Sequence, residues 1–293
     1  MFKLQFPSPS LNRLIQPYGD SSPMGLAWTF MGYSKGYNYF TGFAEVLGGV
    51  LLLFRRTAIA GAIVTILVMG NVMAMNYSFD IPVKLLSTAV VVMCIFLLGK
   101  DMSRLINFFI LNKPTEASIT ATPPIRKKWL RISLLSFKTL LVGYTLVMTI
   151  YGSYSALSQY GDAAPKPPLY GIYDVKTFIR NTDTVPPLKT DATRWNKLVT
   201  NYQGNAAIKM INDSTERLAF EPDTVAKKIM MYNYGDTTHK SAFTYSWPEK
   251  DFLEMKGRWN GDSLIIRMKK FDLNNFRLVS RGFNWINEFP FNR

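Results

Sequence analysis

The chain has 293 residues, enough for one large domain or two ordinary ones. Hydrophobic residues make up 48% of it and charged residues 18%, which argues against a disordered chain and against an ordinary soluble enzyme. The 34 basic and 20 acidic residues give a net charge of +14. A single Cys excludes an internal disulfide framework, and with a single His it argues against a protein-only metal site, so no metal is expected.

The N-terminal stretch, residues 1–36, has no basic region followed by an apolar run, so it does not have the pattern of a signal peptide. Ser22 and Pro23 predict the start of a short helix over residues 24–30, with Ser22 as its cap. Two interpretations stay open for the stretch: an extracytoplasmic loop, or part of an upstream region whose earlier membrane span is missing.

Apolar residues are concentrated between residues 37 and 158, where they predict a multi-pass α-helical membrane bundle. Residues 58–72 and 89–98 are apolar on every side of a helix, which disfavours the alternative of a soluble helical bundle. An interfacial helix with one apolar face is expected at residues 100–112. The expected membrane spans are residues 38–54, 57–77, 81–99 and 130–154.

Basic residues are confined almost entirely to one side of these spans, which indicates that this side is cytoplasmic. The protein is therefore expected in the cell (inner) membrane, with its C-terminal half outside the cytoplasm. Most of the positive charge then reflects the membrane topology, so no nucleic-acid partner is expected. The lipid bilayer is the expected partner. The basic residues on the predicted cytoplasmic side are Arg55, Arg56, Lys100, Arg104, Lys113, Arg126, Lys127, Lys128 and Arg131.

Residues 165–293 predict a mainly antiparallel β domain, because short strand-like runs are separated by turn signals. Asn260-Gly261 favours a type I′ hairpin. Residues 170–180 fit a strand or a short helix, and residues 193–203 predict a helix. The expected strands are residues 206–211, 217–220, 228–232, 242–247, 252–259, 264–268 and 277–279, with turns at 212–213, 221–223, 235–236 and 260–262.

Four tryptophans, Trp195, Trp247, Trp259 and Trp285, are expected to fill the core of this β domain. The aromatic C-terminal tail, residues 281–293, is expected to pack against the domain. The alternative is that the tail forms a binding surface for a ligand or a partner subunit.

Ionisable residues inside a membrane are costly and are therefore candidates for function. Glu45 lies ten residues before Arg55, and Lys138 lies ten residues after Lys128. At about 1.5 Å per residue, both lie roughly 15 Å from the cytoplasmic edge, so they are predicted to approach each other. The alternative is that Lys138 extends towards the interface and Glu45 is protonated.

A second polar group is expected towards the outer ends of the second and third spans. Asn71, Asn76, Asp80 and Lys84 are candidates to line an outward-facing pocket, together with Tyr77. Asp80 and Lys84 are four residues apart, which suits an ion pair on one helix. Alternatively, the two Asn side chains simply hydrogen-bond to neighbouring helices. Gly42, Gly48, Gly49, Gly61 and Gly70 are expected to allow close helix packing.

Residues 41–53, TGFAEVLGGVLLL, followed by Arg55-Arg56 and a second apolar span, resemble the DoxX family of small membrane proteins. The positions that match are Glu45, Gly48 and Gly49, and the resemblance covers residues 37–98. Among family members, the chain is most similar to longer ones from Bacteroidetes-type bacteria, which carry an extracytoplasmic tail. The resemblance implies four membrane helices and, in some members, an accessory role linked to quinones or respiration.

Three functions remain open. The first is a non-catalytic accessory subunit of a respiratory or redox process, with a membrane or periplasmic protein partner; quinone is expected only through the family resemblance. The second is a small-molecule transporter or binder that uses Glu45. The third is a membrane anchor for a ligand- or protein-binding β domain. No catalytic set, phosphate-binding loop or dinucleotide fingerprint is present in the sequence, so an enzyme is the least favoured class.

Overall fold

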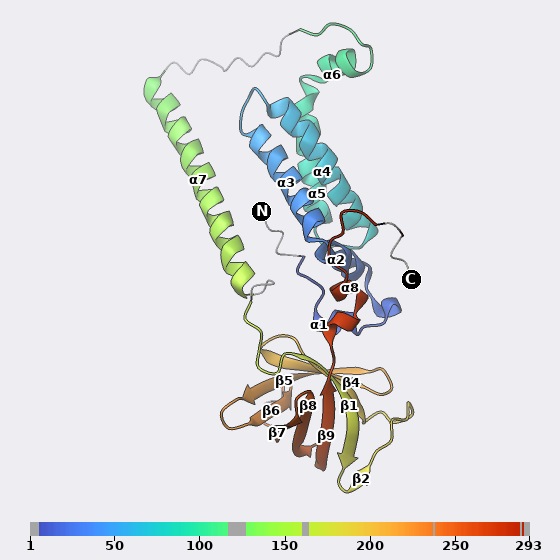
Figure 1. Cartoon of the computed structure of the whole chain (residues 1–293). Coiled ribbons are helices and arrows are strands. Elements are labelled where there is room, and N and C mark those ends of the chain that lie inside the picture. Colours follow the sequence, from blue (N-terminus) through green and yellow to red (C-terminus); the bar gives the residue numbers. More distant parts are fainter. Residues whose placement is uncertain (1–5, 117–126, 160–163, 237, 288, 290–293) are drawn as a thin grey trace. The chain divides into compact units, whose positions relative to one another are not determined.

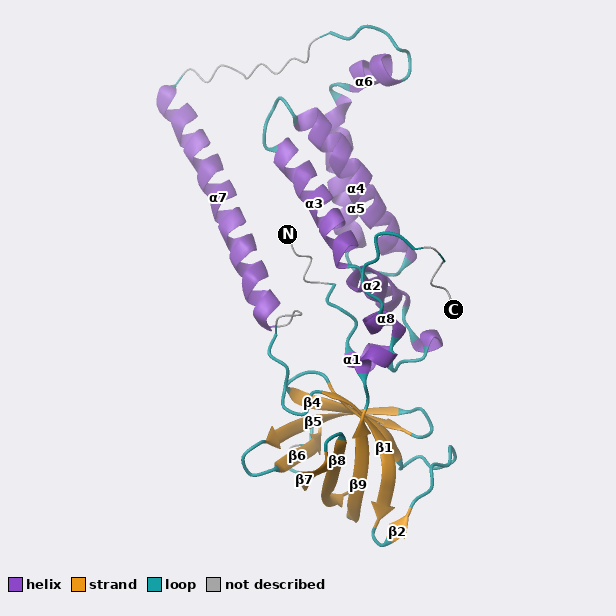
Figure 2. Ribbon diagram, viewed as in Figure 1, coloured by secondary structure: helices purple, strands orange, loops and turns teal. Residues whose placement is uncertain are grey.

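The computed structural model describes residues 6–116, 127–159, 164–236, 238–287 and 289. The chain divides into two compact units. One unit combines the N-terminal residues up to Ser8 with Asp20–Ala164 and is helical; the other combines Pro9–Gly19 with Pro165–Arg293 and is mostly β-sheet (Figure 1; Figure 2). A short N-terminal segment therefore belongs to the unit formed by the C-terminal half of the chain.

The helical unit contains α2 (Pro23–Tyr33), α3 (Lys35–Leu52), α4 (Ala58–Ser78), α5 (Lys84–Gly99), α6 (Met102–Phe109) and α7 (Lys128–Gln159). The predicted cap is confirmed, because the Ser22 hydroxyl accepts a hydrogen bond from the Gly25 amide at 3.1 Å, at the N-terminus of α2. Ser34 caps α3 in the same way, through the amide of Tyr37. The short 3-10 turn at Tyr18–Asp20 precedes α2.

Helices α3, α4 and α5 pack side by side (Figure 1). Gly61 of α4 lies so close to α3 that a Cβ atom there would be 2.7 Å from the Leu52 nitrogen. Gly48 of α3 similarly faces Thr65 of α4. These two glycines allow close packing as predicted, whereas Gly49 and Gly70 have no neighbouring atoms within 4 Å of a Cβ. The apolar centre of this packing is formed by Ala62, Cys94 and Leu98.

Two helices, α4 and α7, are long and apolar enough to cross a membrane. A third crossing is possible if α5 and α6, which are bent by 83° at the break between them, form one span. Membrane-compatible helices followed by an antiparallel β domain are therefore confirmed. Helix α7 is longer than predicted, and none of its 32 residues is buried.

The β unit is a closed eight-stranded antiparallel barrel in which each strand pairs with the next and the last returns to the first. A short strand, β2 (Asp183–Thr184), pairs with the end of β1. The strands that form the barrel are β1 (Gly171–Arg180), β3 (Trp195–Thr200), β4 (Gly204–Met210), β5 (Thr215–Asp223), β6 (Lys228–Asn233), β7 (Ser241–Glu249), β8 (Phe252–Trp259) and β9 (Asp262–Lys270).

Side chains fill the interior of the barrel, as is usual for one of eight strands. The Trp195 ring lies 6.2 Å from Phe178, 6.3 Å from Phe243 and 6.5 Å from Trp259, measured between ring centroids. Around this aromatic centre, apolar residues from alternating strand positions are buried. The predicted hairpin turn is also confirmed, because Asn260 and Gly261 both have positive φ, 51° and 90°.

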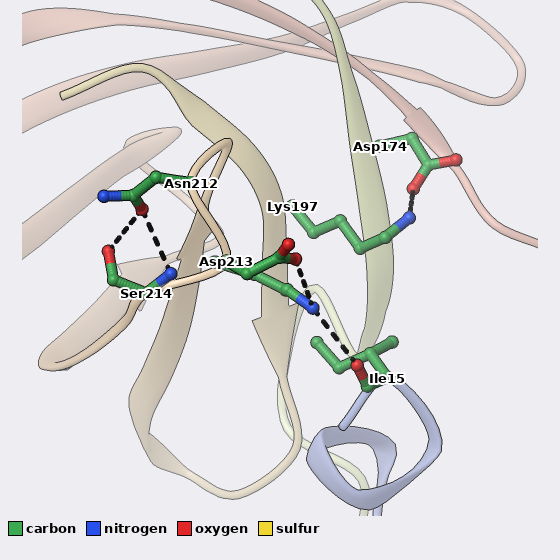
Figure 3. Close-up of polar contacts among 7 residues, drawn as sticks. Ile15, Asp174, Lys197, Asn212, Asp213 and Ser214 are labelled. Atoms are coloured by element: carbon green, nitrogen blue, oxygen red, sulfur yellow. Dashed lines mark hydrogen bonds and ion pairs between the residues drawn. The ribbon is translucent and has the colours of Figure 1, made fainter. Parts of the chain in front are cut away.

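A short helix near the N-terminus, α1 (Leu11–Leu14), packs against the outside of the barrel. Leu11 is only 2% exposed, and it contacts Ile172, Val199 and Ala207 on the outer faces of β1, β3 and β4. Lys209 of β4 links to the same segment, since its Nζ lies 3.4 Å from the Ile15 carbonyl oxygen (Figure 3).

The second contact of Lys209 is an ion pair at 3.0 Å with Asp213, which lies in the next turn (Figure 3). The hydrogen bond and charge of Lys209 lower the pKa of Asp213. On the neighbouring strands, Asp174 and Lys197 form a cross-strand ion pair. The outer face of β1, β3 and β4 is thus covered by an apolar contact and bordered by two ion pairs.

Residues 193–203 were predicted to be helical, but residues 195–200 form strand β3. A register shift between Trp195 and Lys197 places Trp195 and Leu198, three residues apart, in the same core. Val199 is buried on the other side, beneath α1. A bulged strand buried on both faces therefore produces the three-residue spacing of an amphipathic helix.

Two further predictions of strands and turns are wrong. Residues 277–279 were expected to form a strand, but they belong to a short helix, α8 (Arg277–Ser280), which follows a 3-10 turn at Leu273–Asn275. Since β9 already pairs with β1, the closed barrel offers no free edge to a further strand. Residues 221–223 were expected to form a turn, but they end strand β5, and the Asp223 carboxylate accepts from the amides of Val225 and Ala226 in the turn that follows.

The predicted tryptophan core is only half correct. Trp195 and Trp259 are buried in the barrel, whereas Trp247 is 40% exposed and Trp285 is 86% exposed. In the described part of the C-terminal tail, Phe283 is likewise 85% exposed. The expectation that this tail packs against the domain is therefore wrong for residues 281–287 and 289.

Candidate functional site

The helical unit contains a cavity of about 340 Å³ between α2, α3, α4 and the start of α5. Most of its lining is apolar, and four aromatic rings contribute to it. A volume in this range suits a small ligand or the ring system of a larger one. The lining residues are Phe6, Trp28, Met31, Tyr37, Phe40, Thr41, Ala44, Glu45, Leu67, Val68, Asn71, Val72, Met75, Asn76, Ile81 and Val83.

Three of the residues predicted from the sequence line this cavity: Glu45 from α3, and Asn71 and Asn76 from α4. The two helices pack against each other, so one carboxyl group and two amides are brought together among apolar side chains. Low-dielectric surroundings strengthen the polar contacts that such groups make with a bound molecule. The arrangement can bind a molecule that is mainly apolar but carries hydrogen-bonding groups.

Asn76 is 3% exposed and is held by contacts between α4 and α5. Its Nδ2 donates to the Ser87 hydroxyl at 3.0 Å, and that hydroxyl donates to the Lys84 carbonyl at 2.9 Å. The alternative expectation, that an Asn here bonds to a neighbouring helix, is therefore confirmed for Asn76. Its amide is fixed at the cavity wall by the fold.

The N-terminal end of the described chain forms part of the cavity wall. Asn38 Nδ2 donates to the Phe6 carbonyl at 3.2 Å, and the Phe6 ring packs edge-on against Trp28 at 5.1 Å. Gly32 makes room for this segment, because a Cβ atom there would be 2.1 Å from the Pro7 carbonyl oxygen. Phe40 and Leu67, which also line the cavity, are 66% and 69% exposed, so the cavity is reachable from the side of the helices.

Asp80 and Lys84 form the predicted ion pair, at 2.5 Å, in the turn between α4 and α5. Neither lines the cavity. The hydrogen bond and charge of Lys84 lower the pKa of Asp80, which is largely exposed and has a left-handed backbone with φ of 52°. The Tyr77 hydroxyl lies 3.2 Å from that of Thr88, again outside the cavity lining. This pair and this tyrosine therefore stabilise the turn rather than form the polar pocket expected from the sequence.

Lys138 contacts the opposite end of α3 from the cavity. Its Nζ donates to the Leu53 carbonyl at 2.8 Å, just beyond the end of α3. Leu53 lies eight residues after Glu45, which corresponds to about 12 Å along a helix. The hydrogen bond of Lys138 is thus to the backbone rather than to the Glu45 carboxyl group.

The aromatic side of the cavity, formed by Phe6, Trp28, Tyr37 and Phe40, was not predicted as part of a site. The sequence does carry a signal, because aromatic residues are dense between residues 28 and 43. Phe30, Tyr37 and Phe40 form a chain of ring contacts at 5.6 Å and 6.3 Å. Only packing shows which of these rings line the cavity.

Comparison with known proteins gives one partial likeness. Over 84 residues, 29% of the chain, the sequence is 46% identical to the uncharacterized protein YwoB of Bacillus subtilis (strain 168). The chain spans about half the length of this curated relative, 54%. No family model matches the sequence, and no solved structure matches the fold.

Proposed function

We propose that the chain is a DoxX-like integral membrane protein that binds a small lipophilic molecule in the cavity at Glu45. The observation that carries the proposal is the convergence of Glu45, Asn71 and Asn76 on one cavity whose other walls are aromatic and aliphatic. The exposed Phe40 and Leu67 beside it would face acyl chains if α3 and α4 cross a bilayer. A ligand would then enter sideways from the lipid.

A quinone fits this set of residues. The amide of Asn71 supplies a donor for a quinone carbonyl, and the rings of Trp28 and Phe40 supply a flat apolar surface. A bound quinone would act as a carrier of two electrons. The protein's own residues would bind and orient it, in keeping with a non-catalytic accessory role beside a membrane or periplasmic redox partner.

The even number of membrane crossings in this proposal has independent support. The segment Pro9–Gly19, which precedes α3, belongs to the same compact unit as the barrel, which follows α7. Two segments that fold together lie in the same compartment, so the helices between them cross the membrane an even number of times. The proposal assigns four crossings, to α3, α4, α5 and α7, of which α4 and α7 are long and apolar enough by themselves. The basic residues on the Arg55-Arg56 side favour a cytoplasmic location for that side.

A quinone titration followed by tryptophan fluorescence tests the proposal. The detergent-solubilised full chain is titrated with a short-tailed quinone, which should quench Trp28 saturably because that ring lines the cavity. The quenching should disappear in Trp28→Phe. Asn71→Leu and Glu45→Leu should each weaken binding about tenfold or more, because the ligand's polar group is then left without a partner.

Glu116→Gln is the matched control, since Glu116 is an exposed carboxylate that does not line the cavity. Its affinity for the quinone should equal that of the unmodified protein. Quenching that does not saturate, or that is the same in Asn71→Leu, Glu45→Leu and Glu116→Gln, would exclude the cavity as the binding site.

The anchor function is the second candidate, and the exposed aromatic tail of the β unit favours it. Phe283, Trp285 and Phe289 are each more than 75% exposed, so they are available to a partner protein. Under this function, a partner copurifies with the full chain in mild detergent and is lost when these three residues are replaced by Ser. A quinone titration would then show no saturable quenching of Trp28.

A further inference from the structure

Helix α6 (Met102–Phe109) has one apolar side and one polar side, and it does not line the cavity at Glu45. At 3.6 residues per turn, its polar residues fall together. They are Ser103, Arg104 and Asn107. The apolar residues fall on the other side and are Met102, Leu105, Ile106, Phe108 and Phe109.

The contact of Leu105 shows which way the apolar side of α6 points. Leu105 packs against the apolar centre that α4 and α5 share, so this side of α6 is turned towards the helix bundle. Most of the apolar side is nevertheless uncovered. The Phe108 and Phe109 rings, which pack edge-on at 4.9 Å, are 61% and 69% exposed.

The direction of α6 relative to α5 suits a helix that lies along a membrane surface. The two helices are bent by 83° at the break between them. If α5 crosses the bilayer, as in the proposed function, α6 runs almost parallel to the surface of the membrane. Its apolar side, which is turned towards the bundle, then faces acyl chains, and its polar side faces water. This step rests on the proposed membrane crossing and does not depend on the quinone site.

Two lysines, Lys100 and Lys113, flank α6 and are exposed. Within the part of the chain that the structure describes, neither forms an ion pair, whereas Arg104 is paired with Asp101 at 2.6 Å. The chain turns back after α6, because the Lys113 amide donates to the Asn107 carbonyl at 2.8 Å. An ammonium group is thus available beyond each end of the helix, and its flexible stem lets it reach a lipid phosphate.

We propose that α6 lies in the membrane interface and that it binds anionic phospholipids. Phe109 and Ile106 insert among the acyl chains of the leaflet on the Arg55-Arg56 side, and Lys100 and Lys113 bind the phosphate groups of anionic lipids. The bilayer thereby covers the apolar surface that the bundle leaves exposed.

Fluorescence quenching at two depths tests the orientation of α6. In a Cys94→Ala background, Phe109→Cys and Ser103→Cys each carry the label NBD in the full chain, reconstituted into phosphatidylcholine vesicles. Lipids brominated near the headgroup end of the acyl chain should quench the label at residue 109 about twofold more strongly than the label at residue 103. Lipids brominated near the bilayer centre should quench residue 109 less. Stronger quenching from the centre would make α6 part of a bent span and would overturn the proposal.

A comparison of two lipids tests the preference for anionic headgroups. Vesicles contain equal amounts of phosphatidylcholine and anionic phosphatidylglycerol, with bromine on only one of the two. Brominated phosphatidylglycerol should quench the label at residue 109 about twofold more strongly, because Lys100 and Lys113 hold it beside α6. The double variant Lys100→Gln, Lys113→Gln should lose this preference, and high salt should weaken it.

Lys189→Gln combined with Lys250→Gln is the matched control, because it removes the same charge from two exposed lysines of the barrel unit. This control should keep the preference. Equal preferences in the two double variants, or no preference in the chain with all four lysines, would overturn the binding of anionic lipids. Equal quenching at residues 103 and 109 would overturn the orientation.

Flotation of the vesicles separates a failure of this inference from a failure of the proposed function. A chain that does not float with vesicles would overturn the membrane crossings and this inference together. A chain that floats but shows no quenching at residue 109 would overturn this inference alone. The quinone titration is read from Trp28, so its result is independent of the label on α6.

Discussion

Tyr173 is a polar residue on which the barrel depends. It is 1% exposed in the barrel interior, and its hydroxyl donates to the Leu169 carbonyl at 2.9 Å. Burial raises the pKa of Tyr173, and the nearby Tyr245 raises it further. The neutral phenol is therefore the form that the folded barrel accepts, since a buried phenolate would lack both water and a donor.

This pKa shift predicts an alkaline limit to the stability of the barrel. The unfolded chain ionises Tyr173 near pH 10, whereas the folded barrel keeps it protonated to higher pH. The contribution of Tyr173 is therefore complete below about pH 10 and is lost as the pH rises towards the raised pKa. Thermal unfolding followed by circular dichroism between pH 8 and 11.5 should show this loss, and Tyr173→Phe should reduce it.

The Tyr173→Phe variant also loses a hydrogen bond, which lowers its stability by about 1 kcal/mol at neutral pH. Tyr18→Phe is the control, because Tyr18 is 81% exposed. A Tyr173→Phe barrel whose stability falls above pH 10 as steeply as that of the Tyr18→Phe protein would contradict this explanation.

Among the elements, the contact between α3 and α4 positions the cavity. Glu45 lies on α3, whereas Asn71 and Asn76 lie on α4, so their distance depends on how closely these helices approach. Gly61 and Gly48 set that approach, because both face backbone or side-chain atoms of the other helix within 3 Å of a Cβ position.

Gly61→Val should therefore separate α3 from α4. A Cβ atom at residue 61 would lie 2.7 Å from the Leu52 nitrogen, and a helix backbone cannot move away as a flexible side chain can. The expected cost is about 1–3 kcal/mol, with a lower midpoint of thermal unfolding in detergent and weaker binding of the quinone. Gly70→Val, on the same helix but in open space, is the control. Equal midpoints for the two variants would show that Gly61 does not set the packing.

At the scale of the whole molecule, the chain contributes to the barrel unit twice, once before α3 and once after α7. The N-terminal segment thereby constrains the topology of the helices between these two parts. It also completes a cavity of about 480 Å³ on the outside of the barrel, since Arg13 and Asn12 come from this segment and Arg217 comes from the barrel. A soluble barrel made from residues 165–293 alone would lack half of that cavity's polar lining.

Single-cysteine labelling tests the proposed topology. With Cys94, the one native cysteine, replaced by Ala, Tyr18→Cys and Val225→Cys should both react with a membrane-impermeant maleimide in intact cells. Both positions are highly exposed, at 81% and 92%, and both belong to the barrel unit. Arg56→Cys, in the turn between α3 and α4, should react only after the membrane is permeabilised. Labelling of residues 18 and 225 from opposite sides would exclude an even number of crossings.

Local pattern alone predicted much of the secondary structure. The apolar runs gave the positions of α4, α5 and α7 to within a few residues, because a helix that is apolar on every side needs no knowledge of its neighbours. The hairpin at Asn260-Gly261 was also predictable from local sequence, because its turn needs positive φ values only at these two residues. Counting residues back from the Arg55-Arg56 turn placed Glu45 inside the predicted membrane span and made it a candidate site residue. Glu45 does line the cavity.

Tertiary structure decided what depends on distant contacts. Because β9 pairs with β1, the closed barrel leaves no edge for a strand at residues 277–279, which form a helix instead. Strand β3 is buried on both faces, so its apolar residues have the spacing of an amphipathic helix. Packing also separated Asp80 and Lys84 from the cavity that Asn71 and Asn76 share. Leu11 packs on residues more than 160 positions away along the chain. Periodicity carries no signal of such a contact, because the apolar surface that Leu11 covers forms only when the barrel closes.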